Sequence, residues 1–140
     1  MRITTQGDYA LRCILNIAAN GLRGPVPISR IAQDEGLPLD YIEQLLMKLR
    51  RYKLIKSIRG VKGGYLLEKK PSKISVKDVI EAVEGEAFEV ICGRQKHSNG
   101  RACSDFSGCV LKDVWHGLKS HIEGYLEKET IQTLLSRSKR

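Results

Sequence analysis

The segment from Cys92 to Cys109 constrains the fold most, because it cannot build a hydrophobic core of its own. Three of the four cysteines of the chain lie in it, and the residues between Cys92 and Cys103 are polar and contain glycine. Such a stretch buries too little apolar surface to offset the entropy of ordering its backbone. We therefore expect a metal centre or a disulfide to hold it.

Length and charge narrow the class of protein. A chain of 140 residues fits one domain with a real core, and 24 Lys and Arg against 16 Asp and Glu give a net charge of +8. This balance favours a polyanionic partner such as nucleic acid or a membrane surface. Because the chain lacks both a signal-peptide core and a bilayer-spanning apolar run, we expect a cytoplasmic protein without a membrane partner. In that reducing compartment, clustered cysteines bind metal or act in redox chemistry more often than they form structural disulfides.

Helical periodicity dominates the first half of the chain. The first helix is expected over residues 4–20, with Thr5 and Asp8 as a capping box. Cys13 falls on its apolar side and is expected to be a buried hydrophobic residue outside any site.

Two further helical patterns follow in close succession. The first is expected to start at Ser29 as its cap and to end at Gly36, and the second is expected to have Pro38 at its first helical position. The second pattern has apolar residues at the spacing of one helix face: Ile42, Leu45, Leu46 and Leu49. Two helices joined by a turn that contains glycine predict a helix-turn-helix.

A basic hairpin follows the helix-turn-helix pattern. Strand-like runs at residues 55–58 and 65–67 flank a glycine-rich turn, from which Arg59 and Lys62 are expected to project. Helix-turn-helix plus hairpin predicts a winged helix, and an arginine at the wing tip suits a narrow minor groove. The glycines do not have the spacing of a phosphate-binding P-loop.

The last third of the chain predicts helices of a different kind. Ser75 and Asp78 form a cap pattern for a helix that Gly85 ends, and Thr130 is expected to cap a short final helix. Between them, apolar residues recur every three or four positions at Leu111, Trp115, Leu118, Ile122 and Tyr125. This seam is typical of a helix that packs on a partner helix, which favours a homodimer, with packing inside one chain as the alternative.

These patterns define the expected fold class: mainly α with a small β-hairpin wing, a winged helix-turn-helix with a long C-terminal dimerisation helix. The expected organisation is a DNA-binding domain at 1–85, a cysteine-containing cluster loop at 86–110, the dimerisation helix and a short terminal helix at 111–135, and a mobile basic tail at 136–140.

Four stretches of the sequence resemble one known family, the winged helix-turn-helix iron-sulfur regulators typified by the iron-sulfur cluster biogenesis regulator (IscR) and the nitric-oxide-sensitive repressor (NsrR). They are MRITTQGDYALR, IEQLLMKLR, SIRGVKGGYLL and CSDFSGCVLKDVW. The resemblance implies a homodimer that binds double-stranded DNA. It also implies a [2Fe-2S] or [4Fe-4S] cluster held by Cys92, Cys103 and Cys109.

The resemblance extends to the remaining site residues. The biogenesis regulator has a histidine three residues after the last cysteine, where this chain has Lys112, whereas the nitric-oxide-sensitive type uses an acidic residue of the other subunit that matches Asp8. The implied DNA contacts are Leu39, Asp40, Tyr41, Glu43, Gln44, Arg59 and Lys62. Asp40 replaces an expected small hydroxyl residue, and its carboxylate can accept a hydrogen bond from cytosine N4.

The expected function is therefore a dimeric transcription regulator that senses redox state, nitric oxide or iron-sulfur status through the cluster. One alternative is a regulator of the same fold without a cluster, which senses through a partner protein or through cysteine oxidation. Another is a zinc-stabilised DNA-binding protein that uses the three cysteines with His97 or Asp8. We expect that the protein is not an enzyme and has no small-molecule substrate, because the sequence has neither a recognisable set of catalytic residues nor a nucleotide-binding loop.

Overall fold

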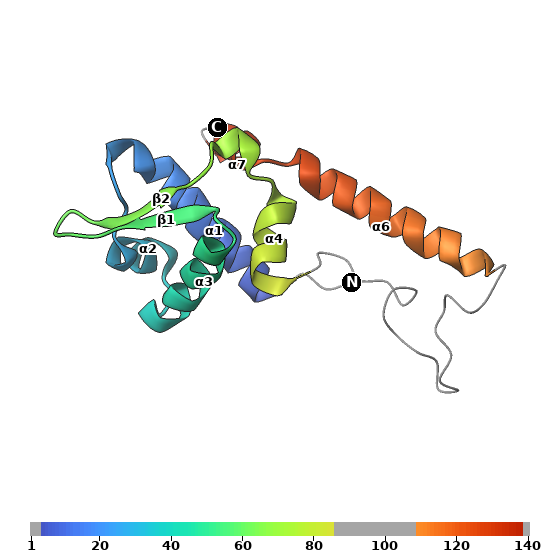
Figure 1. Cartoon of the computed structure of the whole chain (residues 1–140), viewed down its shortest axis with the longest axis horizontal. Helices are drawn as coiled ribbons and strands as arrows, with labels where there is room; N and C mark the ends of the chain where they lie inside the picture. Colours follow the sequence, from blue (N-terminus) through green and yellow to red (C-terminus); the bar gives the residue numbers. More distant parts are fainter. Residues whose placement is uncertain (1–3, 86–108, 139–140) are drawn as a thin grey trace.

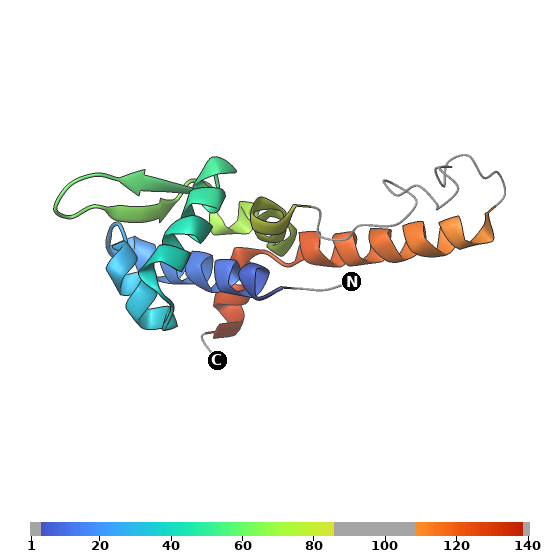
Figure 2. The same cartoon turned by 90° about the horizontal axis from the view of Figure 1, so that it is seen from below.

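The computed structural model describes residues 4–85 and 109–138. The elements in chain order are α1 (Thr5–Asn20), the 3-10 turn η1 (Gly21–Arg23), α2 (Ile28–Glu35), α3 (Leu39–Arg51), β1 (Ile55–Ile58), β2 (Gly64–Leu67), the 3-10 turn η2 (Pro71–Lys73), α4 (Val76–Glu84), α6 (Val110–Lys128) and α7 (Ile131–Ser138). The predicted fold class is confirmed. Figures 1 and 2 show the wing at one end of the molecule and α6 projecting at the other.

The hydrophobic core forms around α1, which packs against α3, α4 and α7. Ile14 and Ile17 of α1, Ile42 of α3, Val79 of α4 and Ile131 of α7 are all fully buried. Full burial of an aliphatic side chain of this size contributes about 1.5–3 kcal/mol. The core therefore ties the last helix of the chain to the first.

The helix-turn-helix has the predicted turn, but its helices start differently from the prediction. Gly36 ends α2 in the left-handed region at φ 64°, which favours glycine. Ser29 is not the cap of α2, because Pro27 is the N-cap and the helix begins at Ile28. Pro38 is likewise the N-cap of α3 rather than its first residue. A proline suits such a place, because the first N–H groups of a helix have no intrahelical partner to lose.

The predicted capping box of α1 does not form. Thr4 is the N-cap, without a side-chain hydrogen bond, and the carboxylate of Asp8 pairs instead with Arg12 at 2.9 Å. The N–H of Gly7 donates to Glu84 Oε1 of α4 at 3.0 Å. A side chain from another helix therefore caps α1.

The wing is an antiparallel hairpin of β1 and β2 that pairs Ile55 with Leu67 and Ile58 with Gly64. Val26, just before α2, exchanges two backbone hydrogen bonds of 2.9 Å with Tyr65 of β2. The base of the wing is thereby attached to the entrance of the helix-turn-helix.

The C-terminal elements confirm most predictions of the sequence. Ser75 and Asp78 form a reciprocal capping box on α4, and Gly85 ends that helix at φ 86°. Thr130 caps α7, because its hydroxyl accepts from the N–H of Thr133 at 3.2 Å. The helix continues to Ser138, so the basic tail expected from residue 136 is helical for its first three residues. Residues 86–108, most of the expected cysteine loop, lie outside the described residues.

The helix α6 has no buried residue. Of the predicted seam, Leu111, Trp115, Leu118 and Tyr125 are exposed by 38–65%. The prediction of a single helix is confirmed, and its apolar seam faces away from the core of its own chain. Within residues 4–85 and 109–138, no helix has the length and apolar character needed to cross a membrane.

Candidate functional site

The helix α3 is the second helix of the helix-turn-helix, here called the recognition helix, and it has an exposed polar face. Its four core residues are Ile42, Leu45, Leu46 and Leu49, each at most 1% exposed. Because these side chains fix the rotation of the helix, the intervening residues Asp40, Glu43 and Gln44 are exposed, and Leu39 is 43% exposed at the first turn. The start of α3 therefore presents both hydrogen-bond donors and acceptors of the kind that read base edges in a major groove.

Tyr41 differs from the other residues that the sequence places in the DNA interface. Its side chain is half-buried, and its ring meets the ring of Tyr9 edge-on, with the centroids 5.9 Å apart and the planes at 89°. An edge-to-face pair of this kind contributes about 0.5–1.5 kcal/mol beyond area burial. Tyr41 therefore attaches the start of α3 to α1, and part of its side chain is left for another contact.

The wing tip carries the two predicted basic residues. Arg59 and Lys62 are both exposed; Arg59 directly precedes, and Lys62 lies within, a turn closed by a 3.0 Å hydrogen bond from Gly63 N–H to Gly60 C=O. Gly60 adopts φ 119°, which side chains rarely allow. Figures 1 and 2 show this tip at the end of the molecule opposite α6. The charge of the tip is thus free to meet a phosphate backbone or a minor groove.

Two basic residues of α3 have contacts that the sequence did not predict. Arg50 donates to Ser57 Oγ of β1 at 3.3 Å, which links the end of the recognition helix to the wing. Lys48 Nζ lies 3.4 Å from the carbonyl oxygen of Val83, to which Gln6 also donates at 3.1 Å. Both contacts join α3 to another element, across 7 and 35 positions in the sequence, so helical periodicity contains no signal for them.

The cysteines within the described residues have opposite environments. Cys109 is an exposed free thiol at the N-cap of α6. Cys13 is fully buried in α1, and burial raises the pKa of its thiol to about 12. Because metals bind the thiolate, Cys109 suits a ligand and Cys13 does not. Cys92 and Cys103 lie outside the described residues.

The carboxylate of Asp8 is accessible. Its side chain is 55% exposed in the pair with Arg12, and the hydrogen bond that Arg12 donates to Asp8 raises the pKa of that guanidinium. Surface ion pairs of this kind contribute at most about 1 kcal/mol, so Asp8 could exchange Arg12 for another partner at little cost. An exposed thiol and an exchangeable carboxylate are donor types that fit iron.

Asp8 and Cys109 do not meet within one chain. Figures 1 and 2 show that the first turn of α6, which Cys109 caps, lies at the far end of that helix from α1. Among the residues that the structure describes, no group of three His, Cys, Asp or Glu side chains could hold a metal ion. If both residues bind one metal centre, they must come from different subunits.

The core fold, the exposed start of α3 and the basic wing tip define a winged-helix DNA-binding protein. Residues 3–137 match the model of the Rrf2 family, described as iron-dependent transcriptional regulators. The chain belongs to this family, and it is a transcription regulator rather than an enzyme.

Three known proteins show the range of similarity. The HTH-type transcriptional regulator IscR of Escherichia coli K12 is 35% identical over 136 residues, which cover 97% of this chain and 81% of that protein. The structure of CymR, the global cysteine regulator of B. subtilis, superposes with a TM-score of 0.78 at 30% identity and covers 98% of both chains. T. potens IscR gives a TM-score of 0.77 at 33% identity and covers 99% of this chain and 88% of its own.

Proposed function

We propose that this regulator is a cytoplasmic homodimer whose binding to DNA depends on an iron-sulfur cluster. The proposed ligands are Cys92, Cys103 and Cys109 of one subunit together with Asp8 of the partner subunit. The observation that carries the proposal is the placement of an exposed thiol, Cys109, at the start of an exposed apolar helix. The similarity to IscR over nearly the whole chain supports the same function.

The proposed dimer follows from the surface of α6. Leu111, Trp115, Leu118 and Tyr125 repeat at intervals of three, four and seven residues and leave large apolar side chains in water. Two copies of such a seam can bury one another by coiled-coil packing. Antiparallel pairing through α6 would also take the Cys109 end of one chain towards the body of its partner, where Asp8 lies.

Operator recognition in this proposal uses α3 and the wing. The exposed residues at the start of α3 would contact base edges in the major groove, while Arg59 would enter the adjacent minor groove. A dimer presents two recognition helices, which must match half-sites about 34 Å apart. No small-molecule substrate is needed for this function.

When bound, the cluster would supply an iron centre that reacts with oxygen or nitric oxide. The residues of the chain determine what such a reaction changes. Asp8 is in the first turns of α1, where Gln6 and Gly7 are hydrogen-bonded to the end of α4. The carbonyl group of Val83 in α4 also contacts Lys48 of the recognition helix. If Asp8 exchanges Arg12 for the cluster, this exchange therefore takes place close to the contact between Val83 and Lys48 of α3.

Anaerobic purification tests the cluster directly, with an absorption spectrum and a count of iron and sulfide. We expect coloured protein from the parent and from Cys13→Ala, and colourless or unstable protein from each of Cys92→Ala, Cys103→Ala and Cys109→Ala. Helical content should be retained in all four variants. A requirement for Cys13 equal to that for the other three would show that the ligand assignment is wrong.

A second candidate function is redox sensing by cysteine oxidation without a cluster. The similarity to CymR of Staphylococcus aureus, whose structure is known in an oxidized form, favours it. In that case, anaerobic protein would contain no iron, and mild oxidation would add oxygen or a disulfide at Cys109. Metal analysis of the same sample also identifies the zinc-stabilised alternative.

A further inference from the structure

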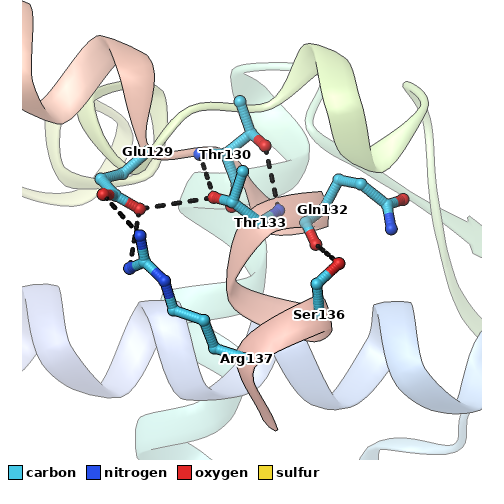
Figure 3. Close-up of polar contacts among 6 residues, drawn as sticks. All are labelled: Glu129, Thr130, Gln132, Thr133, Ser136 and Arg137. Atoms are coloured by element: carbon cyan, nitrogen blue, oxygen red, sulfur yellow. Dashed lines mark hydrogen bonds and ion pairs between the residues drawn. The ribbon is translucent and has the colours of Figure 1, made fainter. Parts of the chain in front are cut away.

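The helices α6 and α7 are joined by only two residues, Glu129 and Thr130. Figure 3 shows that this corner is a concentrated polar cluster. The carboxylate of Glu129 accepts a hydrogen bond of 3.0 Å from Arg137 at Oε1 and forms an ion pair of 3.0 Å with the same guanidinium at Oε2. The hydroxyl of Thr133 lies 3.4 Å from Glu129 Oε2. Glu129 therefore connects the end of α6 to two successive turns of α7.

The side chains at the corner differ in exposure. The side chain of Glu129 is 17% exposed and that of Arg137 is 57% exposed. A bidentate arginine–carboxylate pair fixes direction as well as distance. Because one partner is largely shielded from water, the pair is better placed to hold a geometry than an ion pair between two fully exposed side chains.

The backbone of the same corner is attached to the winged helix. Val76 N–H donates to Glu129 C=O at 2.7 Å, and Ile131 N–H donates to Ile74 C=O at 2.9 Å. Ile131 is fully buried in the core. The α7 side of the corner is therefore rigidly part of the DNA-binding body. On the α6 side, Lys77 of α4 reaches Glu127 at 2.7 Å.

Small rotations at this corner have large effects at the far end of α6. The helix has 19 residues, so it is about 28 Å long at 1.5 Å per residue. A rotation of 10° at one end moves the other by about 5 Å, which exceeds the rise of one base pair, about 3.4 Å. In a dimer joined through α6, the corner angle thus sets the separation of the two recognition helices.

We propose that Glu129 and Arg137 are positioning residues that determine the half-site spacing of the operator. This proposal rests on the proposed dimer, in which α6 connects the two DNA-binding bodies. Neither residue needs to contact DNA. Loss of this ion pair widens the range of angles between α6 and α7. Operators with the preferred half-site spacing are then bound less tightly, and operators with neighbouring spacings are bound relatively better.

The experiment measures spacing preference rather than affinity alone. An operator is first selected from random-sequence duplexes with the full-length parent protein. Its half-sites are then moved apart or together by one and two base pairs, and each duplex is titrated with the parent and with Arg137→Gln. Arg137 is on an exposed face of the last turn of α7, so its replacement should leave the fold intact. Glu129→Gln is the second variant.

The matched control is Ser136→Ala, because the hydroxyl of Ser136 donates to Gln132 C=O within α7 itself (Figure 3). We expect the affinity ratio between the best and the neighbouring spacing to fall about two- to fivefold in Arg137→Gln and Glu129→Gln. It should be retained in Ser136→Ala and partly restored in Arg137→Lys. All variants should have the same oligomeric state by light scattering.

Failure of this proposal differs from failure of the proposed function. A parent with a clear spacing preference and an Arg137→Gln variant with the same preference would overturn the positioning role alone. A monomeric parent would overturn both the dimer and the positioning role, whereas a dimeric parent that binds all spacings equally would overturn the positioning role alone.

Discussion

The carboxylate of Glu84, the last residue of α4, accepts a hydrogen bond from the backbone N–H of Gly7 in the first turn of α1, at 3.0 Å. The two residues are 77 positions apart in the chain. Gly7 is buried, and a Cβ there would lie 3.2 Å from Glu84 Oε1, so glycine permits the close approach. A negative charge at the N-terminus of α1 is also favoured by the helix dipole.

Glu84→Ala is expected to lower the free energy of unfolding by about 1–3 kcal/mol, because it removes a charged acceptor from a partly buried N–H group. Urea denaturation followed by circular dichroism measures the loss. Glu68→Ala, at an exposed position after the wing, is the matched control and should change stability by less than about 0.5 kcal/mol. Equal losses in the two variants would show that the contact with Gly7 contributes nothing.

The same substitution should lower the free energy of unfolding by different amounts at two glycines of the wing. Gly64 has φ 154°, and a Cβ there would lie 2.4 Å from the carbonyl oxygen of Val26. Gly60 has φ 119° with nothing within 4 Å. Gly60→Ala should cost about 1–2 kcal/mol from backbone strain alone. Gly64→Ala should cost clearly more, because it also separates Val26 from Tyr65. Thermal denaturation of the two variants side by side gives the comparison, and equal values would contradict it.

The buried thiol of Cys13 should resist alkylation. Its raised pKa of about 12 keeps the neutral form, so raising the pH from 7 to 9 should produce almost no thiolate there in the folded chain. Iodoacetamide labelling of reduced apo-protein, read by peptide mass spectrometry, should modify the exposed Cys109 readily. Cys13 should react only after denaturation. Labelling of Cys13 in the folded chain at a rate comparable to Cys109 would contradict the buried environment.

Asp8→Ala tests the proposed ligand from the partner subunit. Because the pair with Arg12 is exposed, the apo-protein should lose less than about 1 kcal/mol of stability. The anaerobic absorption spectrum should shift, and cluster loss in air should be faster than in the parent. Arg12→Ala is the control, since it breaks the same ion pair but keeps the carboxylate. His116 lies one turn beyond Lys112 in α6 and is the alternative ligand. If the spectrum is unchanged in Asp8→Ala but altered in His116→Ala, a histidine is the fourth ligand.

The wing predicts two distinct effects on DNA binding. Arg59→Ala should weaken operator binding by about 1–3 kcal/mol, as expected for loss of a groove contact. Lys62→Ala should lower the slope of log affinity against log salt by about one unit, as expected for loss of one phosphate contact. Fluorescence anisotropy across a salt titration measures both. Unchanged affinity and slope in both variants would exclude the wing from the interface.

Local patterns in the sequence predicted the elements whose stability is local. The glycine stop at Gly36, the capping box of Ser75 with Asp78, and the glycine-rich turn of the wing all depend on residues within a few positions of one another. The exposed face of α3 also follows from periodicity, because four buried residues fix its rotation.

Contacts between distant segments could not be predicted in this way. The cap that Glu84 provides for α1 and the inward turn of Lys48 depend on how the helices pack. Thr5 and Asp8 have the spacing of a capping box, but the structure does not form one. Asp8 pairs with Arg12 instead, and Glu84 accepts the hydrogen bond from the N–H of Gly7. The distance between Asp8 and Cys109 within one chain likewise depends on the direction in which α6 leaves the core, which the sequence pattern does not encode.

Because no residue of α6 is buried within its own chain, its apolar seam can change during evolution without weakening the winged-helix core. A cell that contains several related regulators needs each to pair with its own copy. In the proposed dimer, divergence along Leu111, Trp115, Leu118 and Tyr125 would supply that pairing selectivity independently of operator recognition at the other end of the molecule. After a gene duplication, changes in the seam of α6 and changes in α3 could therefore arise separately and give two regulators that neither pair with each other nor share an operator.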